Sequence, residues 1–323
     1  MKLINLKSKS PYLNLAIEEY MFSYCDDDVF MLWQNEPTVV IGKNQNAFAE
    51  INVDYVKENG IHVARRITGG GAVFHDLGNV NYTFIANRKG REGIDFEYFC
   101  TPIIEALADM GIKSSLSGRN DILIEDKKIS GNAQHSKGER VLHHGTILFD
   151  SNLDLLDSAL KVDEEKIKAK AIKSTRSRVT NIKEYLKSDI KVSEFIDKIS
   201  EFVTKKYSAT LIEAPKSEII NELEIRNSSK KWIYPERDYL SHYKITKKKK
   251  FDFALIELFM DMKNDVISDI RIVGDFFGKK DISELEDMIK GRRLSELDEV
   301  ITDVILPDYI YGITASDLIE FIK

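Results

Sequence analysis

Hydrophobic residues recur at two different spacings along the first 150 residues, and the two spacings predict two kinds of element. Between Pro11 and Tyr24 apolar residues return every three or four positions, as in a helix with one buried face. Glu18 and Glu19 are expected on the other, solvent side of that helix. Short apolar runs rich in β-branched and aromatic residues instead predict strands, at residues 29–33, 37–42, 61–65, 80–85 and 142–149.

Two glycines mark the ends of two further helices. Gly60 follows Val53–Asn59 and Gly111 follows Ile103–Met110, at positions where a glycine can adopt the left-handed conformation that closes a helix. Pro102 is expected in the first turn of the second helix, because a proline in a helix interior removes a backbone hydrogen bond.

Residues 117–133 have the pattern of a two-stranded hairpin. Its turn is expected near Glu125–Lys127. If the second strand alternates regularly, Lys128, Ser130 and Asn132 lie on one face of the sheet.

The predicted structure and the charge of the chain change after residue 150 and again after residue 250. Residues 150–210 are predicted to be mostly helical, and the four lysines at 247–250 to form a solvated linker. Residues 251–323 then hold 17 acidic and 8 basic residues, a net charge of −9, whereas residues 1–250 carry +3. In this last part we predict strands at 251–259 and 266–277 and helices at 283–290 and 316–322.

The length of 323 residues favours two domains. We divide the chain into residues 1–246 and a small α+β domain of residues 251–323. The net charge of −6 argues against a nucleic-acid partner. A slightly basic first domain suits an anionic ligand, although the charge asymmetry between the domains could equally be incidental.

Cysteine usage and hydropathy indicate the compartment. Cys25 and Cys100 have no metal-site spacing, so neither a disulfide framework nor a structural zinc site is expected. No apolar run approaches the ~18 residues of a membrane span, and no secretory signal is recognisable at the N-terminus. We therefore expect a reduced, cytoplasmic protein without membrane contact.

The most unusual segment is the glycine stretch, residues 65–76, in which Arg65 and Arg66 precede Gly69, Gly70 and Gly71. Consecutive glycines suit a tight turn or a backbone that approaches a ligand closely, and arginine forks suit phosphate or carboxylate. The spacing matches neither a P-loop nor a dinucleotide-binding fingerprint. The stretch predicts an anionic ligand on backbone N–H groups, unless it is a loop with solvated arginines.

Two later segments, Gly118–Asp121 and Lys128–Ala133, add a strand lysine and an aspartate to these groups. The set suits adenylate formation, in which a carboxylate attacks the α-phosphate of ATP. Such a site must offset the repulsion between two anions, and a lysine can lie between them as a compact positive charge. Asp121 could hold Mg²⁺, which takes one or two carboxylates and keeps several waters.

At five segments, in this order, the chain resembles the lipoate–protein ligases of the long type with an accessory C-terminal domain. The segments are Asn14–Glu19, Arg65–Phe74, Gly118–Asp121, Lys128–Gly131 and His143–Thr146. The resemblance covers nearly the whole chain. It implies a mixed β-sheet flanked by helices, similar to biotin protein ligases, followed by the small domain.

The resemblance also implies the reaction. An enzyme of this family would use ATP and Mg²⁺ to activate lipoate, or octanoate, to the acyl adenylate with release of pyrophosphate. The acyl group would then pass to a specific lysine of an apo lipoyl domain of a 2-oxo-acid dehydrogenase complex, or of the glycine-cleavage H protein. We expect a monomer.

Carried over by motif, the family's roles fall on three groups of residues. Lys128 would contact both the lipoate carboxylate and the α-phosphate and would be the catalytic residue, and Asp121 would hold the metal. ATP would be bound by Arg66, Gly71, Ala72, Val73, Phe74 and Lys128. Lipoate would be bound by Gly70, Gly71, Lys128 and His143, and the supporting residues would be Thr68, Asn120, Ser130 and Gly131. For Arg65, a structural contact and a phosphate contact remain open.

Three other functions compete with this one. An ATP-independent octanoyl or lipoyl transferase of the same fold would use a cysteine nucleophile, yet Cys25 and Cys100 lie outside the motif segments. The motifs argue against a biotin ligase, and a lipoyl-domain binder without catalysis is the last alternative. The choice between lipoate and octanoate, the acceptor and the oligomeric state remain open. A flexible charged linker would favour rotation of the small domain during turnover.

Overall fold

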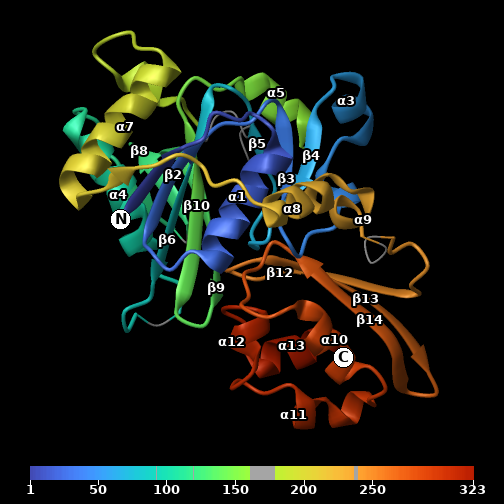
Figure 1. Ribbon diagram of the computed structural model, residues 1–323. Helices are drawn as coiled ribbons and strands as arrows, with labels where there is room; N and C mark the ends of the chain where they lie inside the picture. Colours follow the sequence, from blue (N-terminus) through green and yellow to red (C-terminus); the bar gives the residue numbers. More distant parts are fainter. Residues whose placement is uncertain (92, 119, 161–178, 236–238) are drawn as a thin grey trace.

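The computed structural model describes residues 1–91, 93–118, 120–160, 179–235 and 239–323. Two units are visible in Figure 1, a larger one built around a long sheet and a smaller one formed by the C-terminal part of the chain, in orange and red. The predicted class, α+β with a mixed sheet flanked by helices and a small C-terminal domain, is confirmed.

The large sheet has eight strands in the order β11-β1-β2-β6-β10-β9-β8-β7. β11, β1 and β2 pair in parallel and the remaining neighbours pair antiparallel. The strands are β1 Lys2–Asn5, β2 Val29–Trp33, β6 Asn79–Asn87, β7 Ser115–Ser117, β8 Asp121–Ile124, β9 Lys127–Lys137, β10 Arg140–Leu148 and β11 Thr210–Leu211.

Two hydrophobic cores cover the two faces of this sheet. On one face α4 (Phe96–Asp109) and α7 (Val192–Tyr207) pack against Tyr82, Phe84 and their neighbours. On the other face α1 (Pro11–Tyr24) and α8 (Glu218–Ser228) pack against alternate residues of the same strands, such as Trp33. Alternation along each strand therefore decides which core a side chain enters.

A small second sheet carries the glycine stretch. β3 (Thr38–Ile41) pairs in parallel with β4 (His62–Arg65) and antiparallel with β5 (Val73–His75), so the glycines connect β4 to β5. Apolar residues of this sheet form a core with short helices nearby. These helices are α2 Ala47–Glu50, α3 Val53–Glu58, α5 Leu153–Ala159 and α9 Lys230–Ile233.

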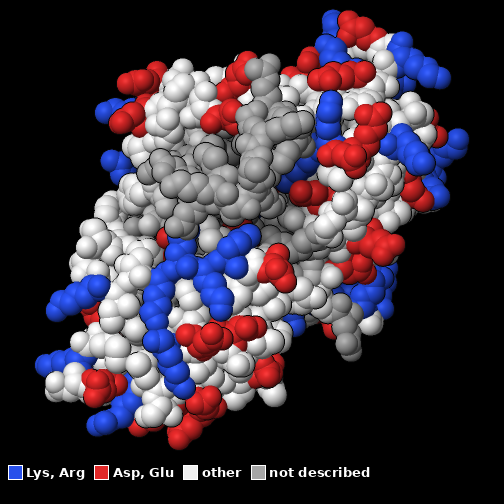
Figure 2. Space-filling view, turned by 180° about the vertical axis from the view of Figure 1, so that it is seen from behind, with Lys and Arg blue, Asp and Glu red and all other residues white. Residues whose placement is uncertain are grey.

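The C-terminal unit has a sheet and a hydrophobic core of its own. Its strands pair antiparallel and are β12 Ile245–Lys250, β13 Leu255–Lys263 and β14 Val266–Gly274. Its helices are α10 Ile282–Ile289, α11 Leu297–Val300, α12 Leu306–Tyr309 and α13 Ala315–Ile322, with a 3-10 turn, η4, at Leu294–Glu296. Figure 2 shows acidic and basic side chains interspersed over the rear face of the molecule.

The lysine run at 247–250 is not a linker, so that prediction is wrong. It forms most of β12, whose side chains alternate between exposed and half-buried. Lysine stems can cover apolar surface while their ammonium groups reach polar partners. Lys247 Nζ donates to the carbonyl of Ile322, and Lys249 Nζ lies 5.0 Å from the ring centroid of Phe251. The lysine run therefore provides no flexible linker about which the small domain could rotate.

Two expectations about helices are also wrong. α4 begins at Phe96, where the Asp95 side chain caps it by accepting from the N–H of Tyr98, so Pro102 lies in the helix interior. Glu18 of α1 is buried rather than solvated. α1 itself has the predicted bounds. In the region predicted as helical, α5, the 3-10 turn η2 (Ile182–Tyr185) and α7 are found, and residues 161–178 lie outside the described residues.

Across the ranges that the structure describes, every helix is too short or too polar to span a lipid bilayer.

Candidate active site

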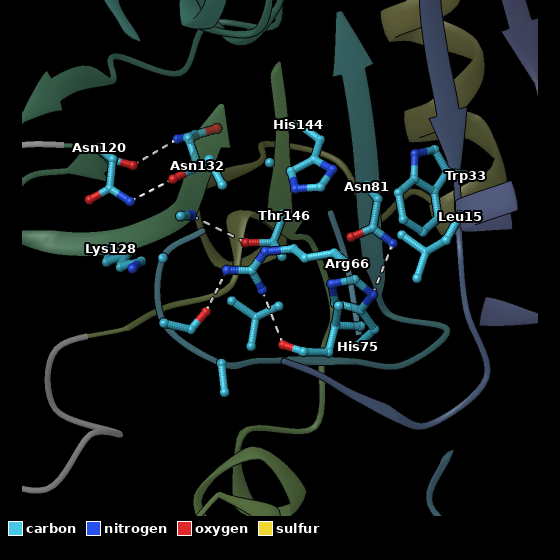
Figure 3. Close-up of a pocket in the computed structure, with 18 residues that line it drawn as sticks. Leu15, Trp33, Arg66, His75, Asn81, Asn120, Lys128, Asn132, His144 and Thr146 are labelled. Carbon is cyan, nitrogen blue, oxygen red and sulfur yellow. Dashed lines mark hydrogen bonds between the residues drawn. The ribbon is translucent and has the colours of Figure 1, made fainter. Parts of the chain in front are cut away.

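A pocket opens between the glycine stretch and the large sheet (Figure 3). The space between its walls amounts to about 610 Å³, part of it open solvent. Leu15 and Trp33 lie at the right of the view, with Asn81 and His75 near them, and Asn120 and Lys128 lie at the left. Large apolar side chains are therefore concentrated at one end of the pocket, the apolar end, and the lysine lies at the other, polar end. It is lined by Leu15, Trp33, Val40, Arg66, Gly70, Gly71, Ala72, Val73, His75, Asn81, Asn120, Lys128, Gly131, Asn132, Ala133, His144, Gly145 and Thr146.

Arg66 holds the glycine stretch in a curled shape. Its guanidinium donates to the carbonyl of Val40 at 3.1 Å and to those of Gly69 and Gly71 at 2.7 Å each. Burial lowers the pKa of Arg66 to about 10. Gly70, at φ +86°, adopts the left-handed conformation that favours glycine. The guanidinium thus binds loop carbonyls here, and its predicted contact with a phosphate stays a prediction.

Arg65, by contrast, makes structural contacts. Its guanidinium donates to the carbonyls of Gly42, Gln45 and Ile233, and it lies outside the lining of the pocket. These contacts join β4 to the loop after β3 and to α9. Of the two roles left open by the sequence, the structural one is found.

Lys128 and Asp121 form an ion pair beside the polar end of the pocket. Lys128 Nζ lies 2.7 Å from Asp121 Oδ1, and 35% and 36% of the two side chains are exposed. They come from the two strands of the predicted hairpin, which turns at Glu125 as expected. The ammonium also lies over Gly131, where an added Cβ would be 2.8 Å from Nζ. Gly131 therefore leaves room for the lysine.

The expectation that Lys128 shares a face with Ser130 and Asn132 is wrong. Ser130 of β9 pairs with Ile122 of β8, and the next residue of β8, Leu123, pairs with Lys128. Two steps along β9 therefore correspond to one step along β8, which is a register shift of one residue. A β-bulge of this kind breaks the alternation of side chains. As a result Lys128 lies with Gly131 on the pocket face, and Ser130 is buried toward the opposite core.

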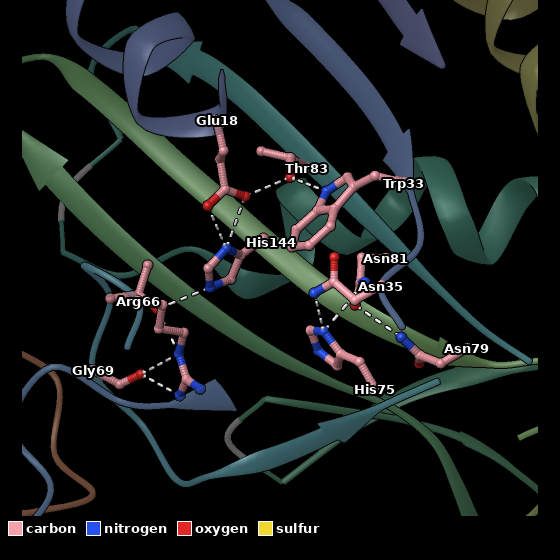
Figure 4. A network of polar contacts seen from close by, with 11 residues as sticks. Glu18, Trp33, Asn35, Arg66, Gly69, His75, Asn79, Asn81, Thr83 and His144 are labelled. Atoms are coloured by element: carbon pink, nitrogen blue, oxygen red, sulfur yellow. Dashed lines mark hydrogen bonds and ion pairs between the residues drawn. The ribbon is translucent and has the colours of Figure 1, made fainter. Parts of the chain in front are cut away.

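A polar network runs from α1 to the glycine stretch (Figure 4). The Glu18 carboxylate contacts His144 Nδ1 at 2.9 and 3.0 Å, and His144 Nε2 contacts Thr68 Oγ1 at 2.9 Å. Thr68 Oγ1 in turn accepts from Arg66 Nε at 2.8 Å. A second hydroxyl, that of Thr83, donates to Glu18. These partners account for the buried carboxylate, since burial of a charge is tolerated when it is paired.

His143 was expected beside the acyl pocket, and this expectation is wrong. It is fully buried in the core under α4, where Gln134 and Tyr82 contact its two ring nitrogens, and burial lowers its pKa well below the usual value. Its neighbour His144 lines the pocket instead, because consecutive residues of a strand point to opposite faces.

The other predicted residues fall into two groups. The pocket is lined by Gly70, Gly71, Ala72, Val73, Asn120 and Gly131. Phe74 and Ser130 are buried, and Phe74 packs in the core of the small sheet, so only its backbone could approach a ligand. Thr68 is also buried and supports His144.

Sequence reasoning missed several lining residues that come from separate elements. They are Leu15, Trp33, Val40, His75, Asn81, His144 and Thr146. His144 and Thr146 were within a recognised motif, and alternation along β10 would have placed both on one face. Trp33 and Asn81 carry no local signal, because they reach the pocket through the pairing of β2 with β6.

Two buried histidines, His75 and His143, and the half-buried His135 predict a loss of stability in acid. Desolvation lowers the pKa of His75 to about 3 and that of His135 to about 4, and burial lowers the pKa of His143 well below its usual value. Unfolded histidines titrate near 6.5, so below about pH 6.5 the unfolded chain binds protons that the folded chain does not. Stability should therefore fall from pH 6.5 toward pH 4, by up to roughly 1.4 kcal/mol per pH unit for each histidine.

Urea unfolding at pH 7.5 and pH 5.5 checks this expectation, with His75→Gln as the comparison. The variant should lose less stability between the two pH values than the wild-type chain. An equal loss in both would show that His75 does not contribute to the pH dependence.

Within the described ranges, no group of three or more His, Cys, Asp or Glu side chains is arranged to hold a metal ion by itself. Mg²⁺ does not require one, because it commonly takes one or two carboxylates together with substrate phosphates and waters. The partly exposed Asp121 beside the pocket fits that pattern.

Two family models match the chain. The lipoyl protein ligase A/B catalytic domain matches residues 10–204, and the bacterial lipoate protein ligase C-terminus matches residues 241–322. The chain is 38% identical to lipoate-protein ligase LplJ of Bacillus subtilis, over 98% of both chains. It is 35% identical to lipoate–protein ligase 1 of Staphylococcus aureus over 100% of both.

Three solved structures are similar in fold. LipL1 of P. falciparum in complex with lipoate has a TM-score of 0.76 and 27% identity over 90% of both chains. A lipoate-protein ligase A bound with ATP has a TM-score of 0.61 and 26% identity, over 72% of this chain and 98% of that one. A bipartite lipoate protein ligase described with its E2 lipoyl domain, from Thermoplasma acidophilum, has a TM-score of 0.61 and 28% identity, over 72% and 96%.

Proposed function

The chain belongs to the lipoate–protein ligases, and from this premise we propose that it activates lipoate with ATP and transfers the lipoyl group to a lysine of an apo lipoyl domain. The observation that carries the proposal is the position of Lys128 at one end of a pocket whose other end is lined by Leu15 and Trp33. Lipoate has the matching shape, an apolar dithiolane chain that ends in a carboxylate.

In the first half-reaction the acyl chain would lie against Leu15, Trp33 and Val40. A carboxylate oxygen would attack the α-phosphorus of ATP, the bond to the β-phosphate oxygen would break, and pyrophosphate would leave. Lys128 would lie between the two anions and offset their repulsion, and the backbone at Gly71–Val73 would approach the nucleotide. Mg²⁺ held by Asp121 would supply further positive charge to the phosphate oxygens.

In the second half-reaction the acceptor lysine would attack the carbonyl carbon of the mixed anhydride. The amide bond would form as the acyl–phosphate bond breaks and AMP leaves. The attacking amine must be neutral, and the cationic site together with desolvation would lower its pKa.

The relatives support each participant. One structural neighbour is described with lipoate, one with ATP and one with an E2 lipoyl domain. We extend these ligands to this chain as part of the proposal, together with Mg²⁺, the alternative acyl substrate octanoate, the alternative acceptor H protein and a cytoplasmic location.

A reconstituted reaction tests the proposal. Purified protein, lipoate, ATP with Mg²⁺ and an apo lipoyl domain should together release pyrophosphate and increase the acceptor mass by one lipoyl group. Omission of ATP or lipoate should abolish both signals. Absence of both signals in the complete mixture would contradict the proposal.

A transferase with a cysteine nucleophile is less well supported. Cys100 is buried, and burial raises the pKa of its thiol to about 12, which disfavours the thiolate nucleophile. Cys25 follows α1, outside the lining of the pocket. If transfer proceeds without ATP and is lost in Cys25→Ser or Cys100→Ser, the transferase is the better description.

A further inference from the structure

A buried chain of hydrogen bonds leads from α4 to the wall of the pocket. Tyr82 of β6 lies at its centre and is fully buried. The Tyr82 hydroxyl lies 2.9 Å from His143 Nε2 and 2.5 Å from Asn132 Oδ1. Asn132 belongs to β9 and is one of the lining residues of the pocket. The reaction proposed above assigns no role to Tyr82 or Asn132.

The donors and acceptors determine which atom donates in each hydrogen bond of this series. The Gln134 side chain accepts from the N–H of Asp95 and donates to the carbonyl of Asp95, which fixes its amide. Its nitrogen then donates to His143 Nδ1, at 3.0 Å. His143 must therefore carry its proton on Nε2 and donate it to the Tyr82 oxygen, which leaves the Tyr82 proton for Asn132.

This arrangement fixes the side-chain amide of Asn132. Its oxygen accepts from Tyr82, so its nitrogen faces the carbonyl of Asn120, to which it donates at 3.0 Å. The backbone N–H of Asn132 donates to the same carbonyl at 3.0 Å, and the Asn120 side chain donates back to the carbonyl of Asn132. Three hydrogen bonds thus tie Asn120, which lines the pocket, to β9. Asp121 follows Asn120 directly and pairs with Lys128.

Gly145 makes the contact between Tyr82 and Asn132 possible. It lies between them in the sheet, opposite Tyr82 on β6 and opposite Asn132 on β9. A Cβ on Gly145 would be 2.0 Å from Asn132 Oδ1 and 2.6 Å from Tyr82 Cε1. Without a side chain at this position, residues two strands apart can meet across the middle strand.

We propose that Tyr82 is a positioning residue for the activation step. By fixing Asn132, it holds Asn120 and the Asp121–Lys128 pair in the arrangement that the reaction requires. The inference rests on the proposed function, because the step that it supports is adenylate formation. Tyr82 does not touch the substrates and acts through Asn132.

Tyr82→Phe tests the proposal, because it removes the hydroxyl and keeps the ring. The kcat for lipoate-dependent pyrophosphate release should fall by about 10- to 100-fold, since small misplacements of reacting groups have effects of this size. The KM for lipoate should stay near the wild-type value, because the apolar end of the pocket is unchanged. Hydrogen–deuterium exchange at the backbone N–H of Asn132, which donates to the carbonyl of Asn120, should be faster in the variant than in the wild type.

A second variant keeps the test valid if Tyr82→Phe folds poorly. Asn132→Asp still accepts from Tyr82 but turns a carboxylate oxygen toward the Asn120 carbonyl, so it should lower the same kcat. The double variant should be no slower than the slower single variant, because both changes break one chain. Cys100→Ala is the matched control. It removes the thiol 3.5 Å from the Tyr82 hydroxyl and leaves Asn132 in place, so kcat should be unchanged.

The outcomes separate the two proposals. A wild-type chain without lipoate-dependent pyrophosphate release would contradict the proposed function, and unaltered exchange at Asn132 in Tyr82→Phe would independently contradict the positioning role. With an active wild type, a normal kcat in Tyr82→Phe, or losses that multiply in the double variant, would overturn the positioning role alone.

Discussion

Replacement of Lys128 by alanine is expected to reduce lipoate- and ATP-dependent pyrophosphate release by roughly 100- to 1,000-fold, the effect of removing one group that stabilises developing charge. The proposed step brings a carboxylate against a phosphate, and no other lysine is among the pocket-lining residues of the described ranges. Steady-state release at saturating lipoate and ATP measures the loss. Transfer from presynthesised lipoyl adenylate should be impaired less, because the two anions are already joined.

The adjacent Lys127→Ala is the matched control. Lys127 is exposed and begins the same strand, so its loss should leave both half-reactions unchanged. Lys128→Ala should also fold normally, because its ion pair is partly exposed and such pairs contribute little stability. Activity of Lys128→Ala near the wild-type level would remove Lys128 from the proposed mechanism.

The second large effect is expected from Arg66→Lys. A lysine cannot reach the carbonyls of Val40, Gly69 and Gly71 together, whereas the arginine fork contacts all three. The glycine stretch should lose its shape, so that the KM for ATP rises and kcat/KM for ATP falls by about 100-fold. Kinetics normalised to the folded fraction, with thermal unfolding measured in parallel, check this result.

Arg65→Lys is the control, because it makes the same substitution at the neighbouring buried arginine. Arg65 is as deeply buried, but its partners belong to the loop after β3 and to α9. The variant should unfold at lower temperature, while its folded fraction keeps a KM for ATP close to that of the wild type. Equal rises in KM for both variants would show that the glycine stretch has no special dependence on Arg66.

Local patterns were sufficient to predict most elements of the fold. The stripe in Pro11–Tyr24 and the apolar runs at 80–85 and 142–149 predicted α1, β6 and β10, because these signals depend on neighbouring residues alone. Glu18 was misplaced for the opposite reason. Its burial depends on His144 and Thr83, which lie far away in sequence. β12 was missed because lysines on an edge strand resemble a solvated run.

The site was predictable to the extent that its residues lie in recognisable segments. Lys128, Asp121 and the glycines do, and the structure gathers them around one pocket. The wrong choice of His143 over His144 and the wrong face for Ser130 share one cause, the side to which a strand residue points. The sequence alone does not reveal where a bulge changes that side.

The bulge in β9 limits which sequence changes this segment can tolerate during evolution. The direction of Lys128 depends on the number of residues that separate it from Gly131, since a shift of one residue exchanges the two faces of a strand. Substitutions that keep this number leave the lysine on the pocket face, whereas loss or gain of one residue would turn it into the core. Between Lys128 and Gly131, length is therefore under stricter constraint than composition, and a gap placed there when related chains are aligned would misassign the lysine.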